Sequence, residues 1–282
     1  MGSEMCIRDR NNGVTVVNRV PMELYLKGVV PSEIVPSWKP DAIKAQAVAA
    51  RTYAVYHKNG YRSAGYDITD DTRSQVYRGC SVETSATNKA VEETAGEIIT
   101  YNGKAIDALF HANGGGYTED SENVWGSYVP YLRGVKEESS STVNRPWHKI
   151  VSIDSFSNAI SRAGYHVGKV KKIGLSRLRM GNNKAKDRGI SGRVKTMEIT
   201  GKSGRKIIPG EVIQSAFDLD STLFDISAKG NNLIITGYGF GHGLGLSQWG
   251  AEAMAEKNGD GKEYYKRILL HYFTGSKIEK IY

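Results

Sequence analysis

Cysteine is scarce in this sequence. The 282 residues include only Cys6 and Cys80. Cys6 lies in residues 1–10, MGSEMCIRDR, which have no hydrophobic centre and read as a tag or cloning scar outside the fold. Cys80 then has no partner for an intramolecular disulfide. Its surroundings, RGCSVET, contain neither a nucleophile elbow nor a papain-like signature, so we expect a small, partly buried core residue.

Long apolar runs are also missing. No stretch reaches the ~18 apolar residues that indicate a membrane-spanning helix, and no signal peptide is recognisable. Hydrophobic residues make up 39% of the chain and charged residues 24%, which is typical of a soluble globular protein. The length predicts one large domain or two small ones.

Acidic residues are few in one region. Between His166 and Lys206 there are thirteen lysines and arginines but two acidic residues, a net charge of +11. The whole chain carries +8, so the remainder carries −3 (8 − 11). Alternating runs at 193–200 and 205–209, broken by glycines, predict exposed β-hairpins there. Such a surface binds polyanions or is simply solvated. Nucleic acid is the rival partner, but no recognised binding module is present and we expect none.

One carboxylate, Glu33, lies between two prolines. Pro31 and Pro36 each fix a backbone φ and bias the preceding residue away from helix, so residues 32–35 are predicted to form a rigid, non-helical corner. Apolar neighbours flank the carboxyl. Desolvation among them would raise the pKa of Glu33 and suit it to general acid catalysis near neutral pH. The alternative is an ordinary surface glutamate.

A helix is predicted from Pro40 to about Tyr56, with Pro40 and Asp41 in its first turn. Small and apolar residues form one narrow stripe along it, which allows another element to approach closely. Lys44 and Arg51 lie two turns apart on a neighbouring stripe, roughly 10 Å along the axis. Two cations on a tightly packed helix are costly unless they face a cleft or an anion. The alternative is that both lie on a solvated edge of the helix.

Two histidines occur beside glycine-rich loops. Asn102-Gly103 predicts a type I′ hairpin whose second strand leads to His111, just before three consecutive glycines. Aromatic residues follow from Tyr117 onward, and their faces suit either sugar C–H groups or core packing. Further on, five glycines alternate between 237 and 245 around His242. Both histidines are candidate ligand contacts or structural groups.

The residues after that loop are also candidates. Ser247 is placed to cap a helix running to about Lys257, and Ser247 and Gln248 are candidate substrate contacts. The remaining predicted elements are strands at 13–19 and 232–238, helices at 21–29, 82–94, 209–219 and 262–273, and a terminal strand.

Two long motifs carry a family resemblance. LYLKGVVPSEIVPSWKPDAIKAQAVAARTYAV and GYGFGHGLGLSQWGAEAMA resemble the two signatures of the stage II sporulation protein D (SpoIID) family, which includes amidase-enhancer (LytB) proteins. FHANGGGYTE and LDSTLF match weaker patterns between them. The resemblance spans about residues 20–275. It implies a protein that acts on peptidoglycan glycan strands outside the cytoplasm. Members usually carry an export signal or anchor, so we expect a trimmed extracytoplasmic portion, membrane-attached only through a missing anchor.

The resemblance also implies roles for single residues. It makes Glu33 the catalytic acid and marks Lys44 and Arg51, which we expect to contact a carboxylate or acetamido group of the substrate. Some members bind zinc through cysteine and histidine just before Gln-Val-Tyr. This sequence has Thr72-Arg73-Ser74 there, so we predict no metal and no cofactor. Gln75 is either a glycan contact or a structural amide.

The predicted fold is α+β, with two lobes and a cleft between them. Residues 11–133 and 232–282 would form the catalytic core lobe, and residues 134–231 an inserted β-rich basic lobe. With one signature carboxylate, the expected activity is that of a lytic transglycosylase, in which the 6-hydroxyl of the muramic acid replaces water. The alternatives are a non-catalytic glycan-binding activator of an amidase, and a hydrolase with a second group.

Overall fold

The chain divides into two compact units. The computed structural model describes residues 4–10, 13–138, 140, 143–182 and 184–282. Unit 1 comprises Met1–Leu109, Met254–Leu270 and Gly275–Tyr282, and unit 2 comprises Phe110–Ala253 and His271–Thr274. The insertion expected at 134–231 falls inside unit 2, which also includes the segments on either side of it. Helices and strands are mixed in the chain, consistent with the predicted α+β class.

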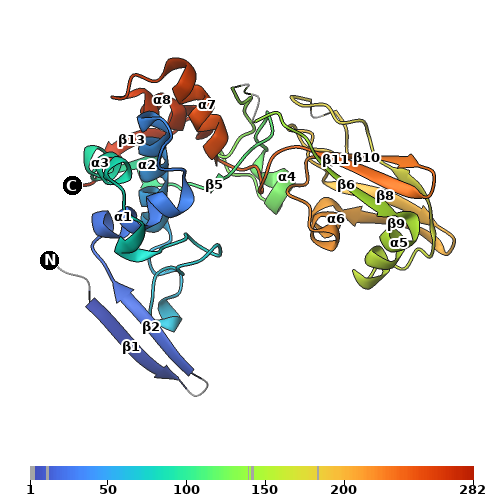
Figure 1. Cartoon of the computed structure of the whole chain (residues 1–282), viewed down its shortest axis with the longest axis horizontal. Coiled ribbons are helices and arrows are strands. Elements are labelled where there is room, and N and C mark those ends of the chain that lie inside the picture. Colours follow the sequence, from blue (N-terminus) through green and yellow to red (C-terminus); the bar gives the residue numbers. More distant parts are fainter. Residues whose placement is uncertain (1–3, 11–12, 139, 141–142, 183) are drawn as a thin grey trace. The chain divides into compact units, whose positions relative to one another are not determined.

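Unit 1 is centred on α2 (Pro40–Tyr56), with the bounds expected from Pro40 and Asp41 (Figure 1). Its other elements are β1 (Glu4–Arg10), β2 (Gly13–Arg19), α1 (Met22–Glu33), η1 (Arg62–Ala64), η2 (Gly79–Val82), α3 (Ser85–Glu93), β3 (Glu97–Tyr101), β4 (Lys104–Ala105), the end of α7 (Gln248–Asn258), most of α8 (Tyr264–Tyr272) and β13 (Lys277–Lys280). Helices α1 and α3 and strands β3 and β4 pack around α2. The predicted stripe of α2 is buried, with Ile43 at 1% and Ala54 at 7% exposure. Most other residues of α2 are buried too, because neighbouring elements enclose the helix on more than one face.

A small antiparallel sheet in the order β13-β3-β4 completes unit 1. The β3–β4 turn has φ of 52° at Asn102 and 72° at Gly103. Two successive positive φ values are what a type I′ turn requires, so the predicted turn is confirmed. The second strand ends at Ala105, however, and His111 lies on the separate strand β5 in unit 2, so the prediction that this strand leads to His111 was wrong. Residues 4–10, expected to lie outside the fold, pair with β2 as an antiparallel strand. Cys80 is exposed in η2, so the prediction of a partly buried core residue was wrong.

Unit 2 holds two three-stranded antiparallel sheets, β10-β11-β6 and β7-β8-β9. Its strands are β5 (Phe110–His111), β6 (Trp147–Ser152), β7 (Val170–Gly174), β8 (Thr196–Gly201), β9 (Gly204–Pro209), β10 (Phe224–Lys229), β11 (Asn232–Gly237) and β12 (Leu246–Ser247), and its helices are α4 (Ser121–Trp125), α5 (Ile153–Arg162), α6 (Gly210–Phe217) and the start of α7. The β8–β9 pair confirms the hairpin expected from the alternating runs. A core gathers around Phe156 of α5 and Phe217 of α6, whose rings stack 4.7 Å apart.

Helix α1 is longer than the prolines predicted. Pro31 lies inside it, and the helix ends only after Glu33, so the non-helical corner at 32–35 begins two residues later than expected. Proline's φ is compatible with a helix, and the cost is the missing N–H. The Ser32 hydroxyl donates to the carbonyl of Gly28 at 2.8 Å, one turn back. Ile34 then turns to an extended conformation, with φ −123° and ψ 155°.

Candidate functional site

Glu33 is partly buried at the end of α1. Its Oε1 accepts a hydrogen bond of 2.7 Å from the backbone N–H of Val76. Burial raises the pKa of the Glu33 carboxyl above 4.5, and the bond from Val76 opposes that shift. Among the described residues, Oε2 makes no hydrogen bond. One oxygen is therefore held, and the other is free to exchange a proton.

Gln75 places the Val76 amide. It is fully buried between α1 and α2, where its Nε2 donates to the carbonyl of Ala50 at 3.2 Å and its Oε1 accepts from the Tyr25 hydroxyl at 3.0 Å. Both ends of the amide are used inside the protein. The structure therefore favours the structural reading of Gln75, as a residue that positions its neighbour, over a glycan contact.

Aromatic rings surround this corner. Tyr77 stacks on Tyr25 with ring centroids 5.4 Å apart. Burial raises the pKa of the Tyr25 hydroxyl well above 10, with the Glu33 charge as the next cause, so Tyr25 stays a hydrogen-bond donor. Burial likewise raises the pKa of Tyr53, and Glu33 adds a smaller contribution. A Cβ on Gly28 would lie 2.6 Å from the Tyr77 ring, so only glycine allows this ring to pack on α1.

Arg51 has a role that the sequence analysis did not predict. Its side chain is 0% exposed, and Nε and Nη2 donate to the two carboxylate oxygens of Glu23 at 2.8 and 2.7 Å. It also donates to the carbonyls of Val91 and Glu97, at 3.2 and 3.1 Å. The expectation that Arg51 contacts substrate is corrected, because its donors are taken up by α1 and the α3–β3 connection.

Lys44 is also buried, at 4% exposure. Its Nζ lies 2.7 Å from Glu93 Oε2 and donates to the carbonyls of Gly261 and Lys262, at 2.9 and 3.1 Å. The anion that this buried cation needs is thus supplied by Glu93, an exposed residue at the end of α3. Neither Lys44 nor Arg51 is among the causes of the Glu33 pKa shift, so they do not oppose its use as an acid.

The remaining candidates lie in unit 2, where His111 and His242 pack with ring centroids 5.2 Å apart. His111 Nδ1 donates to the Leu244 carbonyl at 3.1 Å, and burial lowers the pKa of His111 well below 6.5. His242 Nδ1 accepts from the Leu244 N–H at 3.0 Å, so Nε2 carries the proton donated to the Phe110 carbonyl at 3.1 Å. Both rings are thereby oriented by backbone groups.

Trp125 extends this ring series toward solvent. It is 54% exposed, and its ring centroid lies 5.6 Å from that of His242. Tyr117 is half-buried in a bridge to Lys136. Ser247 is fully buried, and its Oγ accepts from the N–H of Gly250, which confirms the predicted cap of α7. Gln248 is 8% exposed, so Ser247 and Gln248 have little surface to offer a substrate.

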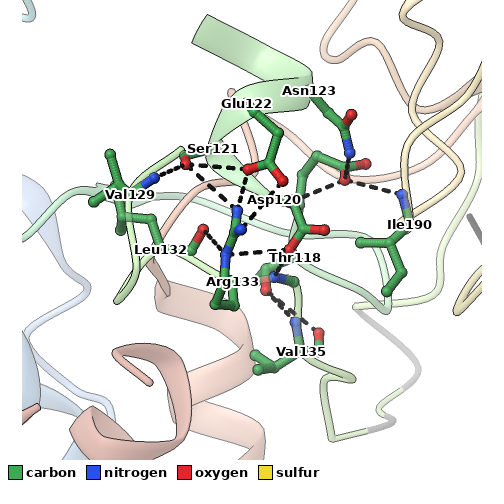
Figure 2. A network of polar contacts seen from close by, with 12 residues as sticks. Thr118, Asp120, Ser121, Glu122, Asn123, Val129, Leu132, Arg133, Val135 and Ile190 are labelled. Carbon is green, nitrogen blue, oxygen red and sulfur yellow. Dashed lines mark hydrogen bonds and ion pairs between the residues drawn. The ribbon is translucent and has the colours of Figure 1, made fainter. Parts of the chain in front are cut away.

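A polar network that the sequence analysis missed ties helix α4 to the segment that follows it (Figure 2). Arg133 pairs with Glu122, lies 3.5 Å from Asp120, and donates to the Leu132 carbonyl at 3.0 Å. Its guanidinium carbon lies 4.5 Å from the centre of the Tyr128 ring. Nothing in the local pattern marked Arg133, since its acidic partners Asp120 and Glu122 lie at the start of α4.

Two family models match parts of this chain. A family model described as "Stage II sporulation protein" matches residues 10–101, and a model for a domain of unknown function matches residues 133–245. An uncharacterized protein of Brachyspira hyodysenteriae is 36% identical over 95% of this chain and 69% of its own length. Stage II sporulation protein D of Bacillus subtilis is 33% identical over 94% of this chain and 76% of its own length. The chain belongs to the SpoIID family.

A third relative differs in length. The amidase enhancer of Bacillus subtilis is 33% identical over 90% of this chain, which covers 40% of that protein. The SpoIID match contains Glu33, Lys44, Arg51 and Gln75, whereas the domain of unknown function contains His242 and the whole basic region. Within the described residues no helix is long and apolar enough to cross a membrane, and no group of three or more metal-ligating side chains gathers.

Proposed function

We propose that this SpoIID-family protein is a peptidoglycan lytic transglycosylase in which Glu33 is the general acid and base. Membership of a family with sporulation and amidase-enhancer members supports a role at the cell wall, outside the cytoplasm. The observation that carries the chemistry is the Glu33 carboxyl, with a raised pKa, one oxygen fixed by Val76 and the other without a partner among the described residues. The bond cleaved joins MurNAc to GlcNAc.

The proton balance needs a single carboxyl group. Protonated Glu33 gives its proton to the glycosidic oxygen as the bond to C1 of the muramic acid breaks. The resulting carboxylate then takes the proton of the 6-hydroxyl of the same sugar, whose oxygen bonds to C1. The product is a 1,6-anhydroMurNAc end, and Glu33 returns to its protonated form. Because the attack is intramolecular, proximity replaces a second catalytic group.

The corner around Glu33 supports both halves of this cycle. Burial favours the protonated form needed for the first step, and the Val76 N–H stabilises the carboxylate needed for the second. The buried Gln75 amide holds Val76 against α1 and α2. The site is thus built on two rigid helices, which limits the freedom of the carboxyl group. Glycan strands without stem peptides are the expected substrate.

The test is mass spectrometry of glycan strands, with and without stem peptides, after incubation with wild type or Glu33→Gln. Anhydro ends made by the wild type alone are expected. Reducing ends would instead show a hydrolase. Thermal melting of both proteins establishes that the variant is folded.

A second function is favoured by one relative. The amidase enhancer of Bacillus subtilis covers 90% of this chain at 33% identity, so a glycan-binding activator of a cell-wall amidase is the alternative. In that case wild type and Glu33→Gln bind glycan equally, neither produces new ends, and both raise the rate of an added amidase.

A further inference from the structure

The basic region of unit 2 has more exposed positive charge than its own acids neutralise. Of thirteen cations between 166 and 206, Arg188 and Arg193 are each 2% exposed and bonded internally. Lys169 pairs with Asp154 and Arg205 with Glu198, and the half-buried Lys195 donates to Asn123. The remaining eight are exposed and form no ion pair among the described residues: Lys171, Lys172, Arg177, Arg179, Lys184, Lys186, Lys202 and Lys206.

Seven of these cations, all but Lys206, follow one path along the chain. Lys206 pairs with Ile199 and Lys172 with the adjacent Thr200, so their side chains leave opposite faces of the sheet. Lys171 and Lys172 lie on β7, an edge strand of its sheet, and Lys202 lies in the β8–β9 turn, where its N–H bonds to the Lys169 carbonyl at 2.9 Å. Beyond β7, the Ser176 N–H donates to Asp187 at 2.7 Å. That bond brings the neighbouring positions Arg177 and Lys186 together. The seven exposed cations therefore form an elongated surface, here called the ribbon, rather than a pocket. Six residues of extended chain span up to about 20 Å.

Two ordinary explanations account for part of this ribbon. Lysines on an edge strand prevent sheets from joining edge to edge, and a register shift between Val170 and Lys172 serves the same end. A solvated basic face also aids solubility. Edge protection explains Lys171 and Lys172. It does not explain Arg177, Arg179, Lys184 and Lys186, which lie outside any strand.

We propose that this ribbon, defined by the seven exposed cations other than Lys206, is a binding surface for a linear phosphodiester polymer of the cell wall, of the polyol phosphate type. It is separate from the Glu33 chemistry and takes from the proposed function only a location at the wall. It gives a role to a region that matches a domain of unknown function.

Charge complementarity selects this occupant. A polyol phosphate carries one negative charge in each short repeat, whereas a glycan strand without stem peptides carries one carboxylate per disaccharide. Between His166 and Lys206 the sequence contains no phenylalanine, tyrosine or tryptophan. Aromatic faces are what proteins stack on sugar rings, so their absence favours a ligand recognised by backbone charge alone. Five of the seven cations of the ribbon are lysines, which contact phosphate as point charges.

The experiment uses fluorescence anisotropy of labelled poly(glycerol phosphate) with the full chain at several salt concentrations. The ribbon variant is Lys171→Gln/Lys172→Gln/Arg177→Gln/Lys186→Gln. The matched control, Lys58→Gln/Lys104→Gln/Lys229→Gln/Lys277→Gln, loses the same charge from exposed positions elsewhere. The ribbon variant should bind at least about tenfold more weakly, with a slope of log K against log salt shallower by about 2–3 units, and the control should bind like wild type.

Three results would overturn the proposal. The first is equal affinity of the ribbon and control variants. The second is tighter binding of wild type to glycan strands or to phosphatidylglycerol–phosphatidylcholine vesicles than to poly(glycerol phosphate). The third is aggregation of the ribbon variant with unchanged affinity of its soluble fraction, which would leave edge protection as the role of the lysines. None of these readouts involves cleavage, so a failure of the transglycosylase proposal leaves them unaffected.

Discussion

The backbone N–H of Val76 donates to Oε1 of Glu33 at 2.7 Å and is the only hydrogen bond to that carboxyl within the described residues. The two residues are far apart in sequence, one at the end of α1 and the other in the loop after η1. The loop reaches Glu33 because the buried Gln75 bonds to both α1 and α2. The geometry at Glu33 therefore depends on a packing contact between a loop and two helices.

Glu33→Gln should stabilise the protein at neutral pH. The folded-state pKa of Glu33 is raised, so between the unfolded value near 4.5 and the folded value the native state binds more protons and stability falls as pH rises. Above the folded pKa the wild type carries the full cost of a desolvated charge. The variant avoids that cost and should be more stable by about 0.5–1 kcal/mol.

Denaturant unfolding from pH 4 to 8 measures this difference. The difference in unfolding free energy between the variant and the wild type should grow above pH 4.5 and then become constant. Glu137, whose pKa burial also raises, is present in both proteins and cancels. A gap that is constant with pH would show that the Glu33 carboxyl has an ordinary pKa. If Glu33 is the general acid, wild-type activity should fall as pH rises through the same folded pKa.

Gln75→Leu should lower kcat more than it raises KM. The change removes the bonds to Tyr25 and Ala50, and unpaired buried groups destabilise by about 1–3 kcal/mol. It also loosens Val76, so the pKa of Glu33 should rise further and the pH profile should shift toward higher pH. Tyr25→Phe, which removes one of the two bonds, is the graded control. If Gln75 bound the glycan directly, KM would rise with no shift of the profile.

Arg51→Met should destabilise the chain by about 3 kcal/mol. The lower end of the range for a broken buried pair applies, because the Glu23 side chain is 26% exposed. The double variant Glu23→Gln/Arg51→Met should lose less than the sum of the single changes, since no charge remains unpaired. Arg51→Lys should also destabilise the chain, because lysine lacks the planar guanidinium that bonds both carboxylate oxygens of Glu23. Additive losses in the cycle would contradict a direct pair.

Gly28→Ala should displace Tyr77. The added Cβ would lie 2.6 Å from the ring, and such overpacking costs about 1–3 kcal/mol. Alanine's better helix propensity offsets part of that by roughly 1 kcal/mol. Tyr77 follows Val76, whose N–H binds Glu33, so a displaced ring should also shift the proposed general acid. Activity should therefore fall by more than the loss of folded protein accounts for. Tyr77→Ala in the same background should restore stability, and failure of that rescue would argue against the clash.

Local signals predicted several elements well. Pro40 and Asp41 mark the start of α2, and Asn102-Gly103 gives a type I′ turn, because these residues act through their own backbone. Pro31 misled the sequence analysis for the opposite reason. The φ of proline fits a helix, and α1, packed against α2 and α3, continues past Pro31 to Glu33 despite the local preference of the residue before proline.

The roles of the cations could not be predicted from sequence. Lys44 and Arg51 look free on a helical wheel, and their partners Glu93 and Glu23 lie on other helices. Which glutamate reaches which cation depends on how α1, α2 and α3 pack. Glu33 was a candidate from its apolar neighbours and from the family resemblance, but the Val76 N–H that orients it belongs to a distant loop.

The peptide groups of Leu244 join two histidines into one unit. Its carbonyl accepts from His111 and its N–H donates to His242. A rotation of this one residue would break one hydrogen bond of each ring, and His242, against which Trp125 packs, would then keep only its bond to the Phe110 carbonyl of the two described above. The glycine-rich loop therefore positions both histidines through the backbone of one residue. Replacing either histidine is expected to alter the position of the other.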